Sequence, residues 1–86
     1  MRITKASAAE ILSKLSPRAK QLLAAMFLHK KDFKFKNKKE YGTLTTELIL
    51  ANILRVDWDI MHHDVIFLLE RGGRFVVDML RESKAA

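Results

Sequence analysis

The chain has 86 residues, a formal net charge of +6 and no cysteine, and almost half of its residues (49%) are apolar. This length accommodates one domain, and this apolar content is sufficient for a packed core. The absence of cysteine excludes disulfides, thiolate zinc sites and thiol catalysis, and the positive charge favours an acidic partner such as nucleic acid.

Hydropathy bears on the location of the protein. The N-terminal segment MRITKASAAEILSKL has no long apolar core of the kind that signal peptides carry. No apolar run approaches the ~20 residues that a membrane-spanning helix needs. We therefore expect a cytoplasmic protein without membrane association. A single domain is expected over 1–86, with its core at about 8–80 and a polar tail at 81–86.

Two helices are predicted in the N-terminal third. The segment Ser7–Glu10 matches a capping box, and the apolar residues that follow predict a short helix at about 8–15. The pair Ser16–Pro17 is a strong start signal for a second helix, because the fixed φ of proline suits the first helical turn. An apolar stripe continues this helix, and the charged run His29–Lys31 closes it.

A lysine-rich stretch, KKDFKFKNKK at residues 30–39, holds six lysines and one aspartate. It leads into a predicted linker at 32–44, and long linkers between helices tend to be functional or to carry a strand. One interpretation is an arm that binds phosphates. Another is a solvated loop that Phe33 and Phe35 fix to the core. A third is stacking of bases on one of these two rings, as in proteins that bind single strands.

The C-terminal half is predicted to hold two more helices, one from about Thr45 or Thr46 to Arg55 and one from Asp57 to about Arg71. Asp57 is the predicted N-cap of the second helix. Gly72 and Gly73 end that helix where a residue with positive φ is wanted. Residues 74–80 then predict either a strand or a final helical turn after a bend, and the two adjacent β-branched valines favour the strand.

Two helices joined by a very short break and followed by a glycine turn form a helix-turn-helix arrangement. The segment LANILRV at residues 50–56 resembles the leucine-alanine-x-x-leucine-x-valine signature of the first helix and turn in winged-helix DNA-binding domains. Gly72 matches the glycine that leads into the wing strand of that family. The expected contact between the two helices joins Leu50, Leu54 and Val56 with Met61, Val65 and Leu68.

The resemblance covers about 16–80 and implies a mainly α, winged-helix-like helix-turn-helix domain with about four helices and one or two short strands. It implies duplex DNA as the partner and a homodimer that regulates transcription or replication, with RNA as a further alternative. The residues expected to contact the nucleic acid are Lys34, Lys36, Lys38, Lys39, Asp59, His62, His63, Arg71 and Arg74.

The segment DWDIMHHD at 57–64 favours a different function, because its three carboxylates repel phosphate. In this alternative the protein is a non-enzymatic protein-binding module that docks through its apolar and acidic fourth helix, with Trp58, Ile66 and Phe67 in contact with the partner. Apolar residues nearly encircle this predicted helix, which also favours a homodimer.

Catalysis finds no support in the sequence. No serine lies in a catalytic setting, and no glycine-rich phosphate loop follows a strand. The histidines lack a third metal ligand within sequence reach. We therefore expect no enzymatic activity, no metal and no cofactor.

Overall fold

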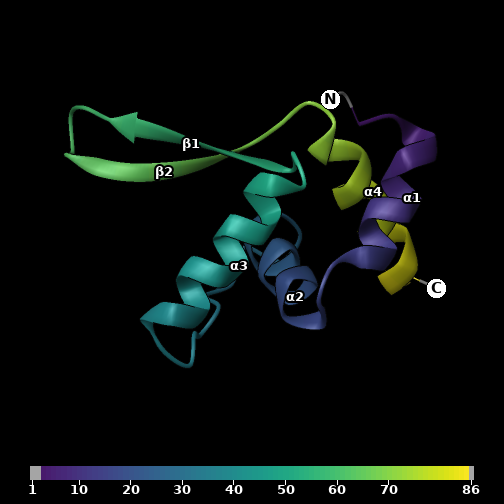
Figure 1. Cartoon of the computed structure of the whole chain (residues 1–86), viewed down its shortest axis with the longest axis horizontal. Helices are drawn as coiled ribbons and strands as arrows, with labels where there is room; N and C mark the ends of the chain where they lie inside the picture. Colours follow the sequence, from purple (N-terminus) through teal and green to yellow (C-terminus); the bar gives the residue numbers. More distant parts are fainter. Residues whose placement is uncertain (1–2, 86) are drawn as a thin grey trace.

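Residues 3–85, which the computed structural model describes, form four helices and one β-hairpin (Figure 1). In chain order the elements are α1 (Lys5–Lys14), α2 (Pro17–Phe27), α3 (Lys38–Leu50), β1 (Leu54–Asp59), β2 (Asp64–Leu69) and α4 (Gly73–Ala85). Helix α4 packs against α1 and α2, and α3 packs against α2. The hairpin starts at the C-terminal end of α3 and extends back over that helix, with its tip away from the other helices (Figure 1). The predicted mainly α class, with about four helices and one or two short strands, is confirmed.

Hydroxyl side chains cap both N-terminal helices. Ser16 caps α2 as predicted, because its Oγ accepts a hydrogen bond from the Ala19 N–H at 3.2 Å and Pro17 occupies the first turn. Helix α1 begins before the predicted start because Thr4, not Ser7, is its N-cap. The Thr4 Oγ1 accepts from the Ser7 N–H at 3.2 Å, and the Ser7 Oγ accepts from the Thr4 N–H at 2.8 Å. Ser7 is therefore the inner member of the capping box.

Helix α3 occupies much of the predicted linker at 32–44, so the predicted start at Thr45 or Thr46 is wrong. Asn37 is the N-cap, and its Oδ1 accepts from the Glu40 N–H at 2.7 Å. Gly42 lies inside the helix, where a Cβ would meet only open space, so this glycine is tolerated and breaks nothing. The helix ends before Arg55, because the chain turns at Asn52 with a φ of 61°.

The segment 57–71, predicted as a fourth helix, instead forms most of the hairpin. Strands β1 and β2 pair antiparallel, with Leu54 opposite Leu69 and Asp59 opposite Asp64. The apolar residues expected to encircle a helix lie on the two faces of these strands, where β-branched and aromatic side chains are favoured. The predicted helix-turn-helix at 45–71 is therefore wrong. Of its expected core, only Leu54 is fully buried, whereas Leu50, Val56, Met61 and Val65 are exposed.

Helix α4 replaces the strand predicted at 74–80 and continues through the predicted polar tail to Ala85. The adjacent valines favoured a strand. However, Val76, Val77 and Leu80 recur at helical spacing, and all three are buried. The packing of this face against α1 and α2 decides the conformation.

The glycine pair before α4 is required for close packing. Neither glycine has a positive φ, contrary to the prediction. A Cβ on Gly72 would lie 2.4 Å from the Cβ of Ile3, and one on Gly73 would lie 2.4 Å from the carbonyl oxygen of Ile53. No other residue fits here without displacing its neighbours.

The core lies among the four helices and the base of the hairpin. Its largest fully buried side chains are Leu23, Leu48, Ile53, Leu54 and Val76. Glu47 on α3 ties this core to the start of α2, because its carboxylate accepts from the Ser16 N–H at 2.9 Å and the Ser16 hydroxyl at 3.1 Å. Within residues 3–85, none of the helices has the length and apolar character needed to cross a membrane.

Candidate nucleic-acid interface

Ten residues, 28–37, connect α2 to α3, and we call this connection the lysine loop. Phe33 and Phe35 are half-buried and pack against the core, whereas every lysine nearby is exposed. The six exposed lysines, which we call the lysine cluster, are Lys30, Lys31, Lys34, Lys36, Lys38 and Lys39. Lys38 and Lys39 belong to the first turn of α3, not to a linker. The two phenylalanines thus fix the loop, as one of the interpretations predicted.

Arg18 on α2 holds the lysine loop in place. Its Nε donates to the Glu40 Oε1 at 2.7 Å, and its Nη2 donates to the Lys34 carbonyl at 3.0 Å. The guanidinium carbon also lies 4.4 Å from the centre of the Phe33 ring. Charge-assisted hydrogen bonds combined with a cation–π contact fix the guanidinium plane in one orientation. Helix α2, α3 and the loop between them are therefore joined at one side chain.

Glu40 is the only acidic residue in the first turn of α3, and the fold uses its charge internally. One carboxylate oxygen accepts from Arg18, and the other accepts from the Lys36 backbone N–H. The hydrogen bond from Arg18, and secondarily the one from the Lys36 amide, hold the pKa of Glu40 below its ordinary value of 4.5. Glu40 is thus ionised and paired with Arg18, so it does not neutralise the lysine cluster.

A row of aromatic rings runs from the lysine loop to the hairpin. The ring centres of Phe33 and Phe35 are 4.9 Å apart, those of Phe35 and Tyr41 are 4.9 Å apart, and those of Tyr41 and Phe67 are 6.3 Å apart. All three pairs are edge-to-face, the geometry that aromatic rings prefer. The rings of Phe33 and Phe35 contact each other, and they also contact Arg18 and Tyr41, respectively. These contacts disfavour the stacking of a base on either ring.

One exposed carboxylate, Asp32, lies among the six lysines of the cluster, which leaves a large excess of positive charge. In the part of the chain that the structure describes, no salt bridge includes a lysine of the cluster. Neighbouring lysines repel one another, and those in the first turn of α3 also oppose the helix dipole. This placement destabilises the isolated chain, and a bound polyanion would relieve it.

The other residues expected at the nucleic acid lie elsewhere. Asp59, His62 and His63 are at the tip of the hairpin, Arg71 is in the turn between β2 and α4, and Arg74 is in the first turn of α4. Figure 1 shows the hairpin tip at one end of the molecule and the start of α4 near the base of the hairpin, both apart from the lysine loop. The structure therefore brings together only the four predicted lysines.

Asp59 organises the hairpin tip. Its Oδ1 accepts from the Met61 N–H at 3.1 Å and the His62 N–H at 3.3 Å, and its Oδ2 lies 2.7 Å from the His62 Nδ1. His63 completes the turn with a φ of 53°. Among residues 3–85, no group of three or more potential ligands gathers to hold a metal ion. The predicted site residues at the tip thus build the turn.

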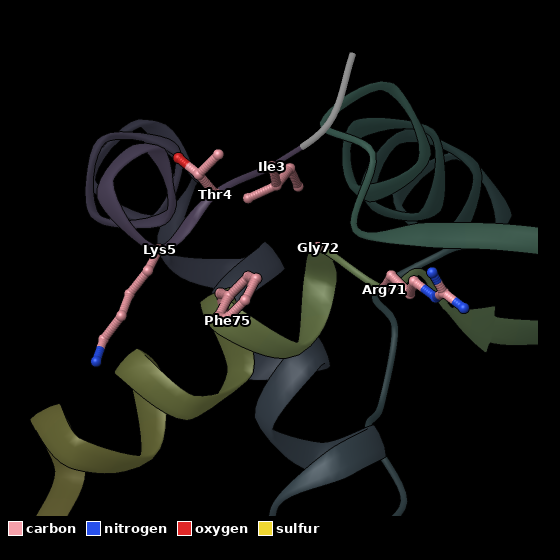
Figure 2. A pocket seen from close by; sticks show the side chains of 6 residues that line it. All are labelled: Ile3, Thr4, Lys5, Arg71, Gly72 and Phe75. Carbon is pink, nitrogen blue, oxygen red and sulfur yellow. The ribbon is translucent and has the colours of Figure 1, made fainter.

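A cavity of about 450 Å³ lies where α1, the β2–α4 turn and α4 meet (Figure 2). Ile3, Gly72 and Phe75 give it apolar walls. Lys5 and Arg71 flank it, and their charged ends point outward from it in Figure 2. No set of polar groups converges inside, which argues against a small polar ligand.

Arg18 and Glu40 are parts of the candidate interface that the sequence did not indicate. They are 22 residues apart and meet only in the fold. Comparison of the chain with protein-family models, curated proteins and solved structures finds no match.

Proposed function

We propose that the protein binds nucleic acid, in the first instance duplex DNA, through the lysine cluster. The observation that carries this proposal is the display of six exposed lysines, within ten residues, on the lysine loop and the first turn of α3, where Arg18 and the aromatic row hold the loop in place. Lysines that neutralise phosphates release condensed counterions, which is the main source of sequence-independent affinity. A pre-formed loop loses less conformational entropy on binding than a flexible one.

Helix α3 supports a duplex as the ligand, because it adjoins the cluster. Beyond Lys39 its exposed face carries Gly42, Thr43 and Thr46, which are small and uncharged. Small side chains allow a helix to approach a groove closely, and threonine can contact bases or phosphates. In the winged-helix arrangement the hairpin follows the groove-reading helix. In this chain α3 precedes the hairpin, so we assign the groove-reading role to α3. The segment 57–71, for which the sequence predicted that role, forms most of the hairpin.

The charge distribution also supports this assignment. The three carboxylates that argued against groove binding, Asp57, Asp59 and Asp64, belong to the hairpin and not to α3. We therefore assign the contacts to the lysine cluster and omit Asp59, His62, His63, Arg71 and Arg74. The proposed role is binding without catalysis, by a cytoplasmic regulator of transcription or replication.

The test compares two variants of equal net charge. In the loop variant, Lys34, Lys36, Lys38 and Lys39 are changed to alanine. In the control, Lys14, Lys20, Arg81 and Lys84, which lie on α1, α2 and α4, are changed to alanine. We expect the loop variant to lose most of its affinity for a fluorescent duplex and the control to lose little. Equal losses would show that only net charge matters, and no loss in the loop variant would refute the proposal.

A protein-binding role remains a second candidate, and the exposure of Trp58 on the hairpin favours it. Of the three residues expected to contact a protein partner, Ile66 is only slightly exposed and Phe67 is half-buried against Tyr41. Trp58 is therefore the main candidate for such a contact. Trp58→Ala should leave duplex affinity unchanged in the same fluorescence assay. A loss of duplex affinity would place the hairpin in the nucleic-acid interface.

A further inference from the structure

The hairpin displays more apolar surface than any other element described. Trp58 is 52% exposed, Ile60 74% and Met61 85%, and Val56 and Val65 are also exposed. Together with the neighbouring Tyr41, these side chains expose roughly 600 Å², at the upper limit for an apolar patch on a monomer and near the ~800 Å² that each partner contributes to a standard interface. A surface of this size indicates a macromolecular partner.

The two faces of the hairpin differ in charge. Residues opposite one another in a sheet share a face, so the pairs Val56–Phe67 and Trp58–Val65 form one face. This face carries no charged side chain. Asp57 and its partner Ile66 lie on the opposite face. An uncharged face can meet an identical face without like-charge repulsion, as a two-fold symmetric dimer requires.

The outer edge of β2 is open and unprotected. Phe67 and Leu69 pack one face of β2 against the core and Tyr41, and the only strand that pairs with β2 in the described chain is β1. The sequence of β2, DVIFLL, contains neither lysine nor proline, the residues that natural edge strands use to prevent pairing with another chain. No backbone hydrogen bond joins its residues to an element beyond the hairpin in the described chain. An apolar edge of this kind is a template for a further strand.

The backbone groups that point outward can be identified. Trp58 and Val65 face one another, yet each N–H donates to the carboxylate of the preceding aspartate at 2.8 Å. This marks a non-hydrogen-bonded pair, so the N–H and C=O groups of Val65 and Phe67 point away from β1. A second copy of the strand would bond these groups, and the Val65 N–H would exchange its bond to the Asp64 carboxylate for one to the partner.

We propose that two copies of this chain associate through antiparallel pairing of their β2 strands, which joins the two hairpins into one four-stranded sheet. We infer that the strand added at this edge comes from a second copy of the chain. Two antiparallel β2 strands can be related by a two-fold axis, and the hairpin tip matches the cavity of its own chain in apolar character and in charge. The tip is apolar and flanked by Asp59 and Asp64. The cavity beside the β2–α4 turn is apolar and flanked by Lys5 and Arg71 (Figure 2).

The charges select the register of the pairing. A two-fold axis at Phe67 would set Asp64 opposite Glu70 of the partner subunit, and directly opposed like charges are destabilising. An axis at Ile66 avoids this clash. It sets Val65 opposite Phe67 of the partner subunit, with their outward backbone groups in position to bond. If this register continues past the ends of the strands, the tip residues Ile60 and Met61 lie beside the β2–α4 turn of the partner subunit. That turn borders the cavity.

The lysine cluster is not part of this interface. The lysine loop lies outside the hairpin (Figure 1). The two surfaces adjoin at Tyr41, but β2 contains no lysine of the cluster, so variants can change one surface without the other. A dimer would also present two lysine clusters to one duplex.

The first experiment uses the absence of native cysteine. Opposite residues of a non-hydrogen-bonded antiparallel pair have Cα atoms about 4.5 Å apart, within the range that a disulfide spans. Ile66→Cys should therefore form a covalent dimer under mild oxidation. The matched control is Asp57→Cys, on the same face of β1, whose symmetric mate would lie about 14 Å away, three strand spacings. We expect cross-linking at least tenfold faster for Ile66→Cys, and equal or absent cross-linking would overturn the proposal.

The second experiment measures mass by sedimentation equilibrium of the full chain. Val65→Pro removes an outward N–H and leaves the ladder between β1 and β2 intact, because proline is tolerated where the N–H faces away. Val56→Pro makes the same change on the outer edge of β1. The dissociation constant of the dimer should rise at least tenfold for Val65→Pro and little for Val56→Pro, with circular dichroism confirming that both fold. A monomeric wild type, or equal effects of the two variants, would contradict the proposal.

Discussion

Arg18 and Glu40 matter to the candidate interface although neither is expected to touch a ligand. They hold the lysine loop through the Glu40 carboxylate and the Lys34 carbonyl. The lysines themselves could be predicted from the sequence, because a dense charge run is exposed in almost any fold. The side chains that hold them could not, because they meet only after α2 packs on α3.

Glu40→Gln should reduce the loss of stability in acid. The folded protein lowers the pKa of Glu40, so the unfolded chain takes up the proton first as pH falls. The stabilising contribution of this carboxylate is therefore complete above its ordinary value of 4.5 and is lost as pH falls through the lowered value. In thermal unfolding followed against pH, Tm should fall more steeply below 4.5 for the wild type than for the variant. Parallel curves would show that Glu40 is not paired as described.

Gly73→Ala tests a close backbone contact. The added Cβ would lie 2.4 Å from the Ile53 carbonyl oxygen, which the Glu70 N–H holds at 2.8 Å. We expect a loss of about 1–3 kcal/mol in the free energy of unfolding. Gly42→Ala is the control, since its Cβ would meet open space within α3, and it should gain about 0.5–1 kcal/mol. Denaturant unfolding measures both, and an unchanged Gly73→Ala would contradict the packing described.

At the scale of elements, the sequence predicts α2 well and the hairpin poorly, and the reason is physical. The start of α2 is set by Ser16 and Pro17, which act within one turn. In the hairpin the apolar residues are dense enough to fit both a helical and a strand period. Helix α4 shows the reverse case, because two valines favour a strand but tertiary burial of Val76 and Val77 decides for a helix. Elements whose conformation depends on distant packing are the ones that local patterns misassign.

Substitutions at Leu54 and Leu68 distinguish the hairpin from the predicted helix-turn-helix. If both residues lay between two helices, each change to alanine would cost about 2–5 kcal/mol. In the structure Leu54 is 2% exposed and part of the core, whereas Leu68 is only partly buried and lies outside it. Leu54→Ala should therefore cost about 2–5 kcal/mol and Leu68→Ala clearly less. Equal costs by denaturant unfolding would favour the helix-turn-helix.

At the scale of the whole molecule, the structure separates two kinds of surface. The lysine cluster lies on the lysine loop and at the start of α3, whereas the three aspartates of 57–64 lie on the hairpin, toward its tip (Figure 1). The sequence places basic and acidic residues in one expected site because it does not show this separation. We accordingly propose phosphate contacts for the first region and apolar association for the second.

The salt dependence of duplex binding tests the central claim most directly. Each phosphate that a lysine neutralises adds about −0.9 to the slope of log K against log salt. In the loop variant, Lys34, Lys36, Lys38 and Lys39 are changed to alanine. We predict that its slope is shallower than that of the wild type by about 0.9 for each phosphate that these lysines neutralise in the wild type. The control with four charges removed from the helices should keep the wild-type slope. A wild-type slope in the loop variant would contradict the assignment of phosphate binding to the lysine cluster.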